Sequence, residues 1–169
     1  AMRMGKYFHF TGFLRGADLS DADLSGAVLC EADLCGTNLL GDRLERADLS
    51  SVIIDETTQL DAKWRLVWEI VNRGGEGLDL SGADLREANL IDVDLHTADL
   101  AGVDLHGALL SGADLSHLDL RWADLQGADL RGADLSDTRL KDAKIDADTR
   151  MDEKWHFVWE IVSRGVAGH

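Results

Sequence analysis

The chain has 169 residues, of which 32 are Asp or Glu and 17 are Lys or Arg, giving a formal net charge of −15. This balance argues against direct binding to nucleic acid or to an anionic membrane surface, because both require positive charge. No stretch approaches the roughly 18 apolar residues that cross a bilayer, and the start lacks the apolar run of a secretion signal. We therefore expect no membrane association and a cytoplasmic location.

Residues 1–13 are rich in aromatic side chains, with Tyr7, Phe8, Phe10 and Phe13 close together. A repeat begins directly after them. The open end of a repeat array exposes apolar side chains and unpaired strand edges. We therefore predict that residues 1–13 form an N-terminal cap.

Residues 14–54 form a first repeat segment with a period of five. Its nine central positions are Leu14, Leu19, Leu24, Leu29, Leu34, Leu39, Leu44, Leu49 and Ile54. The residue two places before each centre is mostly Ala. A period of five fits neither a helix nor a strand, so it indicates one side of a larger closed turn in a repeat architecture.

Residues 55–77 break this period and predict an amphipathic helix followed by a glycine hinge. Five apolar residues share one helical face: Leu60, Trp64, Val67, Trp68 and Val71. Aspartate is a favoured N-cap and glycine a favoured stop, so Asp61 and Gly74 are the expected boundaries.

Residues 78–147 resume the repeat with fourteen more central positions, from Leu80 to Ile145. Residues 148–169 carry a C-terminal capping helix within a near copy of the first helical stretch. Trp155, Val158 and Trp159 stand where the first copy has Trp64, Val67 and Trp68. The chain therefore contains one plan twice, a repeat segment followed by a helix.

The unit A-(D/N)-L-X-X resembles that of the pentapeptide-repeat family over about two thirds of the chain, since 21 of 23 central residues are Leu and two are Ile. The helical stretch is similar to tails of cyanobacterial members. The resemblance implies an all-β solenoid, a right-handed quadrilateral β-helix with 20 residues per coil, here with two short amphipathic α-helices, one inserted and one C-terminal.

If 20 residues make one coil, residues 20 apart stack in rows on the outer surface. Three rows of aspartate then follow in the second segment: Asp79, Asp99 and Asp119; Asp84, Asp104 and Asp124; Asp94, Asp114 and Asp134. These nine residues are a candidate acidic interaction surface. The structural alternative is that they support the corners through Asx-turns and keep the protein soluble.

Other chemistry is scarce in the sequence. Trp122 occupies an outer position and is either a stray surface aromatic or a binding anchor. His96, His106 and His117 do not fall in one row, so we expect no metal site. No catalytic or nucleotide-binding motif occurs, and we expect neither catalytic residues nor a cofactor.

Both helices are expected to pack on repeat coils through Trp64, Val67, Trp68, Trp155, Val158 and Trp159. The first helix either caps its own segment, giving two tandem solenoids, or loops out from one continuous rod. The resumption of the repeat directly after the hinge favours the rod.

These observations indicate a non-enzymatic, acidic scaffold that binds another protein; dimer formation is left open. The alternative is a DNA mimic that inhibits or protects a type II topoisomerase such as gyrase, as some members of the resembled family do. The net charge of −15 over a rod of about 28 Å is one charge per about 1.9 Å, near the value for duplex DNA. The interrupting helix departs from that subgroup.

Overall fold

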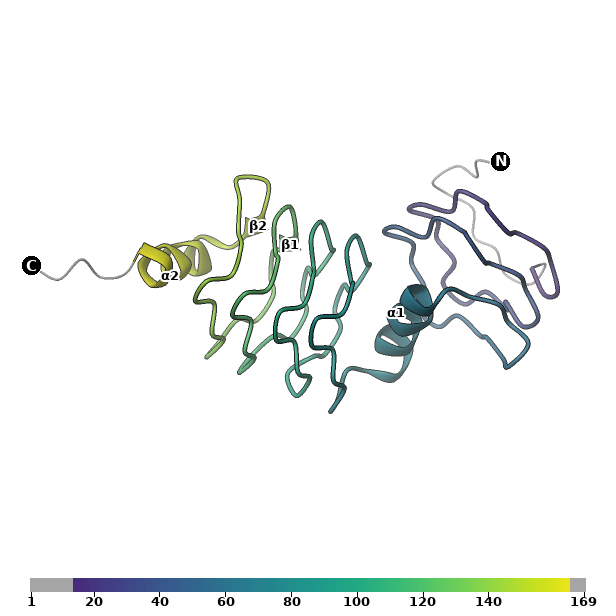
Figure 1. Ribbon diagram of the computed structural model, residues 1–169, viewed down its shortest axis with the longest axis horizontal. Coiled ribbons are helices and arrows are strands. Elements are labelled where there is room, and N and C mark those ends of the chain that lie inside the picture. Colours follow the sequence, from purple (N-terminus) through teal and green to yellow (C-terminus); the bar gives the residue numbers. More distant parts are fainter. Residues whose placement is uncertain (1–13, 165–169) are drawn as a thin grey trace, which may run out of the picture. The chain divides into compact units, whose positions relative to one another are not determined.

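The computed structural model describes the backbone of residues 14–164 and the side chains of residues 14–161. The predicted cap, residues 1–13, lies outside the described residues. The chain divides into two compact units, Ala1–Arg73 and Gly74–His169, which we call unit 1 and unit 2. Within each unit the chain winds into coils that stack in parallel (Figure 1).

The coils have four sides and 20 residues. In unit 2, successive sides of one coil pair with the next coil through four parallel bridges: Asp79↔Asp99, Asp84↔Asp104, Asn89↔Leu109 and Asp94↔Asp114. Unit 1 shows the same spacing, for example at Asp18↔Asn38. The predicted stacking of residues 20 apart is therefore confirmed.

Regular strands are fewer than the expectation of an all-β solenoid suggests. Within residues 14–164 only β1 (Asp129–Leu130) and β2 (Arg150–Met151) are continuous, and they pair in parallel. The other sides meet through single bridges, because turns use most of each five-residue side.

The corner turns explain the glycines of the repeat. Leu80 accepts a hydrogen bond from the Ala83 amide at 3.0 Å, and Gly82 between them has a φ of 64°. A positive φ at the third position of a turn favours glycine, which has no Cβ to clash.

The interior of each coil is filled by the central leucines and the small residue two places before each of them. Leu95, Leu105 and Leu115 are 0% exposed, as is Ala113. Polar residues at the small position need a hydrogen bond there, and Thr37 donates its hydroxyl to the Leu14 carbonyl at 2.6 Å. The side chains at the other three positions of each repeat form the outer surface.

The helix α1 (Ala62–Arg73) begins directly after Asp61 and ends directly before Gly74, as predicted. Its Trp68 indole donates a hydrogen bond to the Val52 carbonyl at 2.7 Å. The Ala32 carbonyl occupies the equivalent position one coil earlier. It accepts a hydrogen bond from a backbone amide of the next coil. The helix thus satisfies a carbonyl that a further coil would have used. α1 therefore packs on the coils of its own segment.

The helix α2 (Glu153–Arg164) docks differently from its near copy. Trp155 donates to the Ala133 carbonyl at 3.3 Å, whereas the Nε1 of Trp159, the counterpart of Trp68, is buried with no hydrogen-bond partner among the described residues. Val158 is 40% exposed, whereas its counterpart Val67 is 1% exposed. Among the helices of residues 14–164, none has the length and apolar character needed to cross a membrane.

Candidate functional site

The nine row aspartates of unit 2 lie exposed or half-buried on the outer surface. Each accepts, through its Oδ1, a hydrogen bond from the backbone amide two residues further on, as in an Asx-turn. The acceptors are Asp79, Asp84, Asp94, Asp99, Asp104, Asp114, Asp119, Asp124 and Asp134. These carboxylates therefore support the corners, which is the structural alternative drawn from the sequence.

Hydrogen bonding also favours the ionised form of several row carboxylates. The Arg121 side chain holds the pKa of Asp119 down at about 2, and the Ser81 hydroxyl lowers the pKa of Asp79. Ser136 lowers the pKa of Asp134 in the same way. The hydrogen bonds of the folded protein therefore stabilise the negative charge of Asp79, Asp119 and Asp134.

Asp119 offers a direct test of this structural role. We expect Asp119→Ala to lower the free energy of unfolding by about 1–2 kcal/mol, because the turn hydrogen bond and the Arg121 pair are both lost. Asp119→Asn should cost less than half as much. Asn38 and Asn89 show that an amide oxygen can accept the same turn bond. Urea denaturation of the two variants measures the difference, and equal losses would contradict the role assigned to the turn.

Lys or Arg side chains pair with some of the aspartates in two of the three rows. Guanidinium nitrogens of Arg86 lie 2.7 Å from a carboxylate oxygen of Asp84 and 3.6 Å from one of Asp104. Arg121 lies 2.6 Å from Asp119, and Lys144 lies 3.1 Å from Asp124. Arg139 also approaches Asp119, at 3.6 Å, so each of these two rows is followed by a basic residue on the next coil.

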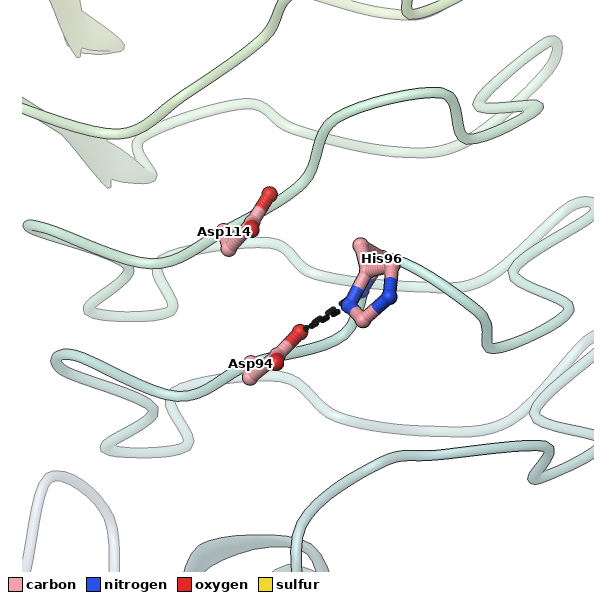
Figure 2. A group of neighbouring side chains, drawn as sticks. All are labelled: Asp94, His96 and Asp114. Atoms are coloured by element: carbon pink, nitrogen blue, oxygen red, sulfur yellow. Dashed lines mark hydrogen bonds and ion pairs between the residues drawn. The ribbon is translucent and has the colours of Figure 1, made fainter.

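The third row holds a cluster that the sequence analysis missed. Asp94, His96 and Asp114 each place one possible metal-ligand atom within 4.8 Å of the other two (Figure 2). Hydrogen bonding to Asp94 raises the pKa of His96, with further contributions from Asp114 and Glu76. The positions of the three histidines alone did not predict this cluster, because its other two members are aspartates. The sequence feature that could have predicted the cluster is Asp94 two residues before His96, together with Asp114 one coil later.

The other two histidines lie outside this cluster. The backbone amide of His106 donates to Asp104, and His117 lies 3.5 Å from Asp137. The expectation that the three histidines do not gather at one place agrees with these partners.

Trp122 is 58% exposed, and its backbone adopts a φ of 62° at a corner where glycine is favoured. The guanidinium of Arg121 stacks over the indole at 5.0 Å from the ring centroid. Gly82 and Gly102 stand at the same corner of the two preceding coils, and a Cβ built on either would meet nothing within 4 Å. The Trp122 ring therefore lies on the same row of corners as two glycines, which carry no side chain.

A groove of about 640 Å³ lies between β2 and α2. Its lining residues are Thr149, Arg150, Met151, Glu153, His156, Phe157 and Glu160. On the same helix Phe157 is 64% and Ile161 43% exposed, whereas Ile70, the counterpart of Ile161 in α1, is 0% exposed. The two helices therefore present different surfaces despite their similar sequences.

A search of curated proteins finds no match for this chain. Three solved structures illustrate its similarities. HetL, a pentapeptide repeat protein involved in heterocyst differentiation regulation from the cyanobacterium Nostoc sp. strain PCC 7120, is 33% identical over 76% of this chain and 57% of its own, with a TM-score of 0.26. Rfr23, a pentapeptide repeat protein of the cyanobacterium Cyanothece 51142, is 30% identical over 80% of this chain and 64% of its own, with a TM-score of 0.21.

QnrB1, a plasmid-mediated fluoroquinolone resistance protein, is 19% identical over 85% of this chain and 62% of its own, with a TM-score of 0.42. The chain thus spans between 57% and 64% of the length of these three proteins. A family model described as pentapeptide repeats, in 8 copies, matches residues 14–51, 79–116 and 113–146. These matches cover more than half of the sequence, and the chain therefore belongs to the pentapeptide-repeat family.

Proposed function

We propose that this chain is a non-enzymatic protein-interaction module, built on the right-handed four-sided β-helix of its family, and that unit 2 binds its partner through the surface around Trp122. The filled interior supports this proposal. Leu105, Leu110 and Leu120 are 0% exposed, so the coils hold no internal cavity at these positions for a substrate. Binding must then use the outer side chains.

The observation that carries the proposal is the backbone conformation of Trp122. Within residues 14–164, ten non-glycine residues have a positive φ, and Trp122 is the only one with a large apolar side chain. The left-handed conformation costs an L-residue about 1–2 kcal/mol. A strained residue with a 58% exposed ring is explained by a role in binding, and Trp is enriched among binding hot spots.

This interpretation predicts that Trp122→Gly does not destabilise the protein. Glycine removes the strain, while the loss of the exposed ring and its Arg121 contact costs about 1 kcal/mol or less. We expect the free energy of unfolding to stay constant or to rise by up to about 1 kcal/mol. Urea denaturation measures it. A loss above about 1 kcal/mol would show that Trp122 serves packing.

Site-specific photocrosslinking tests the function. A photoreactive phenylalanine analogue at position 122, in the full chain mixed with cell extract, should give discrete crosslinked proteins that mass spectrometry identifies. The matched control places the analogue at Asp137, another exposed corner of unit 2 with a positive φ of 58°. Crosslinks specific to position 122 support the proposal, and identical crosslinks from both positions overturn it.

The DNA-mimic alternative is favoured by one observation, the row of Asp94, Asp114 and Asp134. No ion pair with Lys or Arg is formed by these three within the part of the chain that the structure describes. A gyrase supercoiling assay with linear DNA as competitor tests it. Inhibition that linear DNA relieves, and that Asp→Asn changes in this row weaken, would favour mimicry over binding through Trp122.

A further inference from the structure

The Asp94, His96 and Asp114 cluster is built by the coil geometry itself. Asp94 and Asp114 are bridge partners on adjacent coils, so their side chains leave neighbouring backbones in the same direction. His96 follows on the same corner, and its Nδ1 lies 2.5 Å from the Asp94 Oδ1. Figure 2 shows the Nδ1 side of the imidazole turned toward the two carboxylates.

The charge around this pair differs from that of the row formed by Asp84, Asp104 and Asp124. Asp84 and Asp104 share Arg86, and Asp124 pairs with Lys144. Asp94 and Asp114 instead have only His96 as an ionisable partner within the described residues. A neutral imidazole is a metal ligand, whereas a guanidinium or an ammonium group is not.

From this geometry and donor set we propose that Asp94, His96 and Asp114 form a binding site for a divalent first-row transition metal ion, with Zn²⁺ as the probe. Two carboxylate oxygens and one imidazole nitrogen suit such ions. Binding joins the ion to the Nδ1 lone pair and to one oxygen of each carboxylate, and releases any proton shared between Nδ1 and Asp94. Water fills the remaining positions.

The site depends on one residue that its row does not repeat. Ser116 and Ser136 occupy the position of His96 on the next two coils. His96→Ser therefore removes the nitrogen ligand and installs a residue that the same corner already accepts. Asp114→Asn removes a charged ligand but keeps an oxygen that can accept the turn bond from Ser116.

Isothermal titration of the full chain with ZnCl₂ tests the proposal, with circular dichroism to verify folding of each variant. We expect one equivalent to bind the wild type, and the affinity of His96→Ser and Asp114→Asn to fall about tenfold or more. His106→Ser, on another face of the same unit, should bind like the wild type. Equal affinity of the wild type and His96→Ser, or no saturable binding, would overturn the site. The imidazole NMR signals of His96 should shift on addition of Zn²⁺, and unchanged signals would also contradict it.

Discussion

Replacing Trp64 by alanine is expected to lower the free energy of unfolding of unit 1 by about 3–5 kcal/mol. Trp64 is 5% exposed in α1, and Val67 and Ile70 on the same helix are 1% and 0% exposed. Few coils stand behind this helix, so the loss is a large part of the stability that a small unit can have. Urea unfolding followed by far-ultraviolet circular dichroism measures it.

The internal repeat supplies a matched control. Trp155 stands at the same place in the near copy but is only half-buried, and its indole hydrogen bond is long, at 3.3 Å. Trp155→Ala should therefore cost less than half as much as Trp64→Ala. Equal losses would show that α2 docks as closely as α1, which contradicts the exposed face described above.

Replacing Asp42 by threonine is expected to raise the free energy of unfolding at neutral pH by about 1–3 kcal/mol. Asp42 is 5% exposed at an inward position of the repeat. Its Oδ1 accepts a hydrogen bond from the Ala22 amide at 2.8 Å, but its Oδ2 is buried and has no hydrogen-bond partner in the part of the chain that the structure describes. Thr37 and Thr58, at equivalent positions, donate their hydroxyls to leucine carbonyls, so threonine fits this environment.

The pH dependence of wild-type stability provides a second test of the buried Asp42 carboxyl. Burial raises the pKa of Asp42 from 3.8 to about 6, with smaller contributions from Asp21 and Asp61. The contribution of the protonated carboxyl to stability is therefore full below pH 3.8 and is lost as the pH rises through about 6. The advantage of Asp42→Thr over the wild type should grow across this window. Asp42→Asn, which does not titrate, controls for the other ionisable groups. An advantage that stays constant from pH 4 to about 7 would contradict the assignment.

Local sequence patterns predicted much of the fold. The five-residue period of leucines predicted the stacked coils, and Asp61 and Gly74 predicted both ends of α1. The 20 residues per coil that the family resemblance implied predicted which aspartates stack, as the bridges Asp79↔Asp99 and Asp94↔Asp114 show. The turn chemistry of aspartate predicted their hydrogen bonds.

The sequence did not predict contacts that differ between its two near copies. Val67 and Val158 occupy equivalent places in near copies, yet one is buried and the other is 40% exposed. The periodicity of apolar residues shows which face of a helix is apolar. It does not show how much of that face the last coil covers. In α1, Asn72 also donates to the Leu49 carbonyl at 2.9 Å, and the sequence has Ser163 at its counterpart in α2. The spacing of the histidines likewise did not predict the cluster at His96, because Asp94 and Asp114 supply two of its three groups.

The most direct test of binding through Trp122 measures the affinity of the partner crosslinked from position 122 for the wild type and for Trp122→Gly. The measurement is made at about 0.1 M and about 0.5 M salt, since the higher salt shortens the screening length to about 4 Å. We predict that the wild type keeps its affinity within about twofold, and that Trp122→Gly binds about tenfold more weakly at both salt concentrations. Equal affinity of the two proteins, together with binding that is lost at high salt and competed by linear DNA, would contradict the proposal and assign binding to the aspartate rows.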